Sequence, residues 1–389
     1  MNKSPAARMQ TLPSNFFADI EAQIAAMQAG GQDVIRLDVG SPDLPPPPSV
    51  IETLERSARS PDHHGYQPHL GPQRLRQAWA EMYRQLYGIE LDPERQVLPL
   101  LGSKEGIFNF TQAWAGPGDV VLAPDPGYMT YARAAAFAGA EVYPLPLLPG
   151  NAFLPDLEAI PPEIARRARL LWLNYPNNPT AAVAGRDFMA SAVAFARRHD
   201  LWLCHDAAYA RVTFDGYRAP SVLEIPGAEG VAVEFNSLSK SHNMAGWRVG
   251  AALGNSEALQ PLFRLKSNLD SGHFLPVMEA AVAALGTDQS WLDERNRVYQ
   301  RRRDAVVPAL RDIGLDAALP QGSIYVWCAV PHGWNSLDFT LEILGKACVS
   351  LTPGTVFGEQ GEGYVRLALT AGTERLEEAM QRLAEWRRS

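Results

Sequence analysis

The segment VAVEFNSLSKSHNMAGWRVGAALG, residues 231–254, joins two apolar runs through a polar turn that contains Lys240. Short apolar runs bounded by turn residues are typical of buried strands. Packing explains Lys240 poorly, because an unpaired ammonium group is costly to bury. A lysine amine also condenses with aldehydes, and its removal from water shifts its pKa down towards the nucleophilic range. The segment therefore predicts a reactive amine at the end of a buried strand.

Five more apolar runs precede this segment, and most are separated by longer helical patterns. They are QVLPLL, DVVLAP, EVYPLPL, LLWLNY and LWLCHD, within residues 95–255. Such alternation predicts an α/β fold with a mostly parallel sheet flanked by helices. Polar, Gly-rich or Pro-rich motifs follow the runs directly, at the carboxyl ends of the strands, where open α/β sheets bind ligands. The motifs could therefore converge on one crevice.

We expect three parts in the chain. Residues 1–42 form an N-terminal arm that belongs partly to a small domain, and the prolines of residues 44–48 form a stiff connector. Residues 43–284 form the large domain. Residues 285–389 form a small C-terminal α+β domain with a charged helix, the two strands SIYVWCAV and GYVRLALT, and a final helix.

Composition limits the possible partners. The chain has 389 residues, with 35 Lys plus Arg against 43 Asp plus Glu and a net charge of -8, so we expect neither nucleic acid nor membrane as a partner. Three cysteines without metal-type or disulfide-type spacing, and no signal peptide or spanning run, predict a cytoplasmic protein. His63, His64 and His69 lie close in sequence, but no acidic or cysteine ligand pattern accompanies them, so we expect no metal.

Two segments suit a phosphate group. Ser237, Ser239 and Arg248 supply hydroxyls and a guanidinium around the lysine. Ser103 and Lys104, in LLGSKEG, follow a predicted strand and begin a helix, where free backbone N–H groups and the helix dipole favour an anion. Simpler readings remain open: a turn with an exposed lysine and a surface arginine, and a serine that only caps a helix.

The lysine segment resembles the pyridoxal 5'-phosphate (PLP) signature of the class I and II aminotransferases, members of fold type I, and the likeness extends over nearly the whole chain. It implies a mostly parallel seven-stranded sheet in the large domain. It also implies that Lys240 holds PLP as a Schiff base and then acts as the catalytic base. Asp206, in LCHDAAYA, would keep the pyridine nitrogen protonated, and Tyr209 would donate to the phenolic oxygen. Asp206 could instead be a helix N-cap.

The same resemblance assigns residues to the ring and the substrate. Asn178, in NYPNNPT, would bind the phenolic oxygen, and Tyr128, in PDPGYMTY, would stack on the pyridine ring. Arg366, in GEGYVRLALT, would hold the substrate α-carboxylate in a bidentate fork, with a backbone contact from Gly40. A generic Asn-Pro turn, a core tyrosine and a surface arginine are the structural alternatives.

Tyr66, in GYQPHLG, matches a family tyrosine that reaches the phosphate of the neighbouring subunit's cofactor. The resemblance therefore implies a homodimer whose active sites are shared between subunits.

Within the family, the strings GSKEG, NYPNNPTAA, KSNLDSG and FGEQGEGYVRLALT are most similar to the LL-diaminopimelate aminotransferase branch. Asn15 is expected to contact the substrate, although the branch usually has a tyrosine at this position. Lys266, Asn268, Asp270 and His273 are expected to face the substrate side chain and to offer both signs of charge.

The expected reaction is a ping-pong exchange of an amino group between an amino acid and a 2-oxo acid. Two alternatives stay open. A PLP-dependent carbon-sulfur β-lyase shares the scaffold and most cofactor residues. A ligand-sensing, non-enzymatic module of a transcription regulator would carry an N-terminal DNA-binding domain, for which the residues before the proline run are too few and not basic enough.

Overall fold

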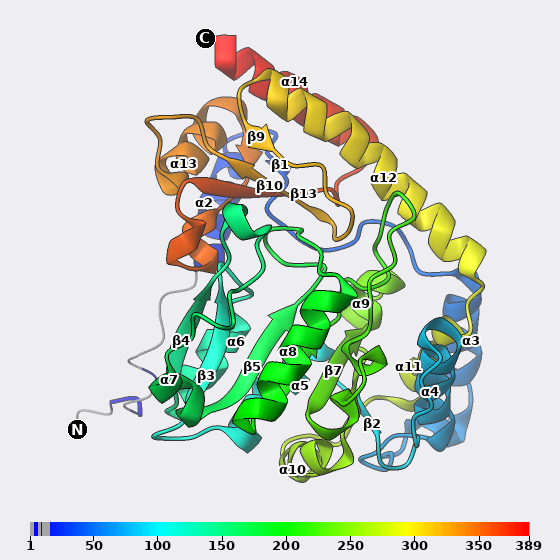
Figure 1. Ribbon diagram of the computed structural model, residues 1–389. Helices are drawn as coiled ribbons and strands as arrows, with labels where there is room; N and C mark the ends of the chain where they lie inside the picture. The colour runs from blue at the N-terminus through cyan, green and yellow to red at the C-terminus, as the bar shows by residue number, and fades with distance from the viewer. Residues whose placement is uncertain (1–3, 7–8, 10–15, 389) are drawn as a thin grey trace.

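A seven-stranded sheet forms the centre of the computed structural model, which describes residues 4–6, 9 and 16–388 (Figure 1). The strands lie in the order β2-β8-β7-β6-β5-β3-β4. Only β8 runs antiparallel to its neighbours, so the predicted mostly parallel sheet is confirmed. Each apolar run forms one strand: β2 (Val97–Leu100), β3 (Val120–Asp125), β4 (Glu141–Pro146), β5 (Ala168–Asn174), β6 (Trp202–Asp206), β7 (Ala232–Ser237) and β8 (Gly250–Gly254).

Helices cover both faces of this sheet. On β5, Leu170 and Trp172 pack into the cluster beneath one set of helices, and Leu171 and Leu173 pack into the cluster on the opposite face. This alternation requires apolar residues at every position, which explains the continuous run. One face carries α5 (Ser103–Trp114), α6 (Thr130–Ala138) and α10 (Ser256–Lys266), and the other carries α7 (Pro162–Arg167) and α8 (Arg186–His199).

The edge near β2 and β8 is covered by a further group of helices. These are α3 (Pro48–Ala58), α4 (Gln73–Tyr87) and α11 (Leu275–Leu285), which share a buried cluster with both strands. The proline run leads directly into α3, with Pro48 in its first turn, where a missing N–H costs nothing.

A second, smaller group of strands lies beside the large sheet. Its four-stranded part has the order β12-β13-β10-β9, and β1 pairs in parallel with β11. The N-terminal residues therefore pair with the C-terminal part of the chain, while the exact domain bounds stay a prediction. The elements are α2 (Phe16–Ala29), β1 (Ile35–Arg36), β9 (Asp316–Ala317), β10 (Tyr325–Ala329), α13 (Ser336–Ala347), β11 (Val349–Ser350), β12 (Thr352–Pro353), β13 (Tyr364–Ala368) and α14 (Thr373–Arg388).

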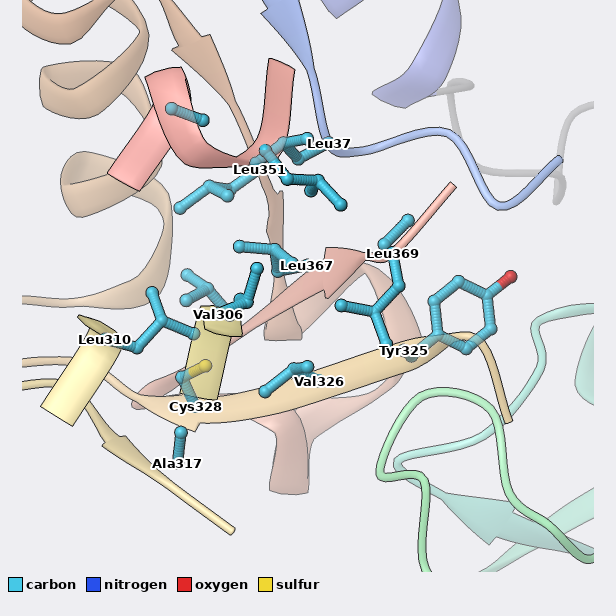
Figure 2. Close-up of a cluster of buried hydrophobic side chains, with 14 of the residues drawn as sticks. Leu37, Val306, Leu310, Ala317, Tyr325, Val326, Cys328, Leu351, Leu367 and Leu369 are labelled. Atoms are coloured by element: carbon cyan, nitrogen blue, oxygen red, sulfur yellow. The ribbon is translucent and has the colours of Figure 1, made fainter. Parts of the chain in front are cut away.

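The core of the smaller group is aliphatic. Leu37, Val326, Leu351 and Leu367 meet side chains of the long helix α12 (Gln289–Asp312). Figure 2 shows Tyr325 at the edge of this cluster, with its hydroxyl directed away from the aliphatic side chains. Tyr325 therefore takes part in the core through its ring and leaves its hydroxyl for another role.

Helix α12 links the two groups of strands. Its C-terminal half packs against β9 and α14, and Figure 1 shows α12 and α14 side by side. Its N-terminal half contacts the turn that carries Lys240, on the short helix α9 (Leu238–Ser241). Over the described residues, none of the helices is long and apolar enough to cross a membrane.

Candidate active site

A cavity of about 480 Å³ opens where β5, β6 and β7 end. Asn174, Asp206 and Ser237 are the last residues of these strands, and all three line the cavity. Parallel strands present their carboxyl ends at the same edge, so separate motifs meet there. The predicted residues that line it are Gly40, Ser103, Lys104, Tyr128, Asn178, Asp206, Tyr209, Ser237, Ser239, Lys240, Arg248 and Arg366.

Lys240 projects into the cavity from α9, and its Nζ donates a hydrogen bond to the backbone oxygen of Gly40. Burial lowers the pKa of the Lys240 amine, and the nearby Tyr325 and Asp206 offset this only in part. A lowered pKa increases the neutral fraction of the amine near neutral pH, and only the neutral amine is nucleophilic.

Asp206 lies across the cavity with a buried carboxylate. Tyr131 Oη donates to its Oδ2 at 2.8 Å, and the backbone N–H of Ala208 donates to its Oδ1 at 3.2 Å. Asn174 fixes the backbone by donating from Nδ2 to the Asp206 carbonyl at 2.7 Å. Burial raises the pKa of Asp206 despite these hydrogen bonds. A carboxylate in this position gains most from a cationic partner placed in the cavity.

Two tyrosines approach each other beside Lys240. The hydroxyls of Tyr209 and Tyr325 are 3.1 Å apart. Burial raises the pKa of Tyr209. Burial also acts to raise the pKa of Tyr325, but the charges of Arg366 and Lys240 and the Tyr209 hydrogen bond together lower it. The pair therefore offers one persistent hydroxyl donor and one more acidic hydroxyl.

Arg366 is only 4% exposed and lies on β13. Its Nη1 donates to Asn178 Oδ1 at 2.9 Å, and its Nη2 donates to the Asp38 carbonyl at 2.8 Å. Its guanidinium carbon lies 4.1 Å from the ring centroid of Tyr325 and 4.7 Å from that of Phe357. The buried Nε has no hydrogen-bond partner. A buried, unsatisfied guanidinium donor is suited to a carboxylate ligand.

Arg248, two serines and the start of a helix form a group suited to an anion. Arg248 Nη1 lies 3.4 Å from Ser239 Oγ, and Ser237 Oγ accepts from the Ser239 N–H at 3.1 Å. Helix α5 begins here after Gly102, whose φ of +83° places it in the left-handed region, and no side chain caps the helix. A methyl group at Gly102 would overlap Arg248 Nη2. The glycine therefore lets the guanidinium lie close to the start of the helix, where it and the free N–H groups could donate to the same anion.

These features fit PLP. Groups suited to an anion, the aromatic ring of Tyr128, a buried acid, and an amine with a lowered pKa line one cavity. Among the residues that the structure describes, no three His, Cys, Asp or Glu side chains form a group that could hold a metal ion.

The residues expected to face the substrate side chain form contacts within the chain, and their role stays a prediction. Lys266 is 2% exposed, and its Nζ donates to Asp270 at 2.8 and 2.9 Å, because a buried ammonium needs an acidic partner. Asn268 donates to the Arg264 carbonyl, and His273 lies 2.6 Å from the Arg248 carbonyl. All four lie outside the lining of the cavity in this chain.

Two other predicted residues are not brought to the cavity. Tyr66 is 93% exposed on the surface of the single chain. Asn15 lies outside the described residues. Their roles stay predictions.

Sequence reasoning missed several residues at the site. Tyr131 follows Tyr128 by three residues, so helical spacing could have indicated it. Tyr325 lies in a predicted strand with no local signal of function. Arg36 forms a bidentate pair with the buried Asp38, at 2.8 Å for both hydrogen bonds, and both line the cavity.

Comparisons with known proteins agree over the full length. A family model described as aminotransferase class I and II matches residues 32–383. The LL-diaminopimelate aminotransferases of Moorella thermoacetica and Desulforudis audaxviator are each 49% identical over 378 residues, covering 97% of this chain and 97% and 96% of those proteins.

Solved structures give the same result. Substrate-bound BacF from Bacillus subtilis has a TM-score of 0.95 at 36% identity, covering 100% of this chain and 98% of that chain. An aspartate aminotransferase mutant from Thermus thermophilus has a TM-score of 0.92 at 28% identity, covering 99% of this chain and 100% of that chain. The chain belongs to the class I and II aminotransferases, which are PLP-dependent transaminases of fold type I.

Proposed function

We propose that this chain transfers an amino group from LL-diaminopimelate to a 2-oxo acid. The observation that carries the proposal is the full-length similarity to enzymes named for that reaction. This similarity covers 97% of the chain.

The mouth of the cavity supports a substrate with charge at its far end. Glu21 and Arg36 both line the cavity. Glu21 Oε1 lies 3.7 Å from Arg36 Nη1, so both signs of charge meet at one place. Diaminopimelate carries a second ammonium and a second carboxylate, which groups of opposite charge can recognise.

The proposed roles follow from the placement of the side chains. When bound, PLP supplies an aldehyde that condenses with amines and a ring that delocalises negative charge from the substrate α-carbon. Lys240 would hold the cofactor through its amine and would later accept the proton of that carbon on Nζ. Asp206, whose carboxylate accepts a hydrogen bond from Tyr131, would keep the ring nitrogen protonated. Arg366 binds the α-carboxylate, and the orientation it imposes favours loss of the α-proton.

The remaining contacts bind the cofactor. Tyr209 and Asn178 would bind the phenolic oxygen, and Tyr128 would stack on the ring; all three line the cavity. The residues proposed to hold the phosphate are Ser103, Lys104, Ser237, Ser239 and Arg248.

We further propose a homodimer with shared active sites. Tyr66 is 93% exposed, Leu269 61% and Phe274 44%. The rings of His64 and Phe274 are 5.4 Å apart, so the segments of Tyr66 and Phe274 lie near each other. An exposed apolar area of this kind is suited to a second copy of the chain. The cytoplasmic location stays a prediction.

The test is a donor screen of the purified holoenzyme with 2-oxoglutarate as acceptor. We expect LL-diaminopimelate to give the highest kcat/KM among LL-diaminopimelate, glutamate, aspartate and aromatic amino acids. A preference for any other donor would reject the substrate. Pyruvate release from cystathionine without an oxo acid would instead indicate the β-lyase, which no observation here favours. Asn15→Tyr, assayed in parallel, shows whether this departure from the branch changes the preference.

A further inference from the structure

Arg295, on the N-terminal half of α12, is buried without an acidic partner. It is 3% exposed, and among the described residues it forms no ion pair with Asp or Glu. Burial lowers the pKa of Arg295 to about 10. Its neighbours on the same helix differ, because Arg302 pairs with Asp43 and Arg303 pairs with Asp215. A buried cation with no counter-charge destabilises the fold unless its hydrogen bonds compensate.

The hydrogen bonds of Arg295 go to two segments of the active site. Nη1 donates to the Lys240 carbonyl at 2.6 Å, and Nη2 donates to the Arg211 carbonyl at 2.8 Å. The Lys240 carbonyl lies at the end of the short helix α9, where carbonyls lack partners within the helix. Arg211 lies two residues after Tyr209. One rigid guanidinium therefore joins the backbones that carry Lys240 and Tyr209.

Adjacent contacts support the same connection. Asn296 donates from Nδ2 to the Arg211 carbonyl at 3.1 Å. One turn earlier on α12, Trp291 stacks on His242, with ring centroids 6.1 Å apart and planes 6° apart. His242 is fully buried and follows Lys240 by two residues. The first turns of α12 thus contact the lysine segment at Lys240 and at His242.

We infer that Arg295 is a positioning residue, which sets the direction of Lys240 Nζ relative to Tyr209 by holding the two backbone carbonyls in one fork. A planar guanidinium does this better than an ammonium, because its donors have a fixed geometry. The inference rests on the proposed role of Lys240 and is independent of which amino acid is the donor.

The test substitutes Arg295 by Gln, whose shorter side chain cannot span both carbonyls. We expect kcat with any active donor to fall roughly 10- to 100-fold, since small displacements of a reacting group have effects of this size. KM should stay within about twofold, because the substrate carboxylate meets Arg366 instead. Apoenzyme mixed with pyridoxal phosphate should form the light-absorbing Schiff base more slowly, in proportion to the loss of kcat. The pH at which half of the Schiff base is protonated, read from its absorbance, should also change.

Arg303→Gln is the matched control, because Arg303 is 1% exposed on the same helix and contacts Asp215 and the Pro320 carbonyl. It should lower Tm but leave the Schiff-base rate and pH midpoint unchanged. Arg295→Lys, which keeps the charge, should show a smaller loss of the same kind.

Wild-type Schiff-base rate and kcat in Arg295→Gln, with a loss of Tm alone, would reduce Arg295 to a structural role. Failure of both Arg295 variants to fold would also count against the inference, because the residue would then serve the fold. Persistence of the cofactor band in Lys240→Ala would instead reject the lysine assignment itself.

Discussion

Burial shifts the pKa values of two ionisable groups that line the cavity in opposite directions. It lowers the pKa of the Lys240 amine and raises the pKa of the Asp206 carboxyl. Both shifts favour the neutral forms of these two groups in the site without cofactor. A protonated pyridine ring bound next to Asp206 would lower the pKa of this carboxyl again. The carboxylate would therefore form when the cofactor is bound.

Asp206→Asn should therefore stabilise the apoenzyme at neutral pH. When the pKa of a carboxyl in the folded protein is raised above 3.8, the carboxyl stabilises the folded protein at pH values below 3.8. This stabilisation is lost as the pH rises through the pKa of the folded state. We expect the Tm of the apo variant to exceed that of apo wild type at pH 8, and the difference to shrink towards acid. The same substitution should lower kcat on the order of 100-fold, because the ring nitrogen loses its counter-charge.

Differential scanning calorimetry of the two apoenzymes across pH provides the measurement. An apo variant less stable than wild type at pH 8 would show that Asp206 is stabilised as an anion without the cofactor.

Arg366→Lys should weaken binding of the amino donor and leave the cofactor in place. The lysine ammonium group can replace only part of the planar guanidinium, which donates to Asn178 and to the Asp38 carbonyl. One hydrogen-bond donor to the substrate carboxylate is therefore lost. We expect kcat/KM to fall roughly 10- to 100-fold, mainly through KM. Steady-state kinetics with the absorbance spectrum as control checks this, and an unchanged KM would place the carboxylate elsewhere.

Residues next to the end of a strand could be predicted from the sequence to line the site, because the last residue of an apolar run can be recognised in the sequence. Asn174, Asp206 and Ser237 each close such a run. Tyr325 could not be placed, because its strand lies in another sheet and only tertiary packing brings its hydroxyl to Tyr209. Arg295 shows the same limit, since a charged helical pattern gives no sign that one arginine is buried.

The strands of the large sheet were predictable, whereas the short strands of the smaller group were not. Each strand of the large sheet has an apolar run long enough to recognise. By contrast, β9, β11 and β12 have two residues each, so their existence depends on pairing with distant partners.

The start of α5 provides a prediction about the phosphate cradle. Gly102→Ala should weaken PLP binding, because its φ is +83° and the added methyl group would overlap Arg248 Nη2. Gly185→Ala is the matched control: Gly185 also precedes a helix, has a φ of -86°, and leaves open space for a methyl group. Titration of apoenzyme with pyridoxal phosphate should show a higher Kd for Gly102→Ala alone. Equal affinities would indicate that the phosphate binds elsewhere.

A shared active site predicts complementation between inactive dimers. A dimer of one Tyr66→Ala subunit and one Lys240→Ala subunit contains one intact site, because each subunit supplies what the other lacks. After random exchange in an equal mixture, activity should reach roughly one quarter of the wild-type rate per subunit. Mixing Asp206→Asn with Lys240→Ala is the control, since both residues belong to one subunit's site and no intact site can form.

Light scattering should show a dimer for every variant in this experiment. If the first mixture gains no activity while subunits exchange, Tyr66 does not reach the partner's site. A monomeric wild-type protein would reject the dimer itself.

The most direct measurement is borohydride reduction of the purified holoenzyme, followed by mass spectrometry of its peptides. Reduction makes a lysine–cofactor bond permanent, so the adduct identifies the residue. The structure predicts one phosphopyridoxyl group per chain, on the peptide that contains Lys240. An adduct on another lysine such as Lys104 or Lys266, or a protein that takes up no pyridoxal phosphate, would contradict the placement of the active site.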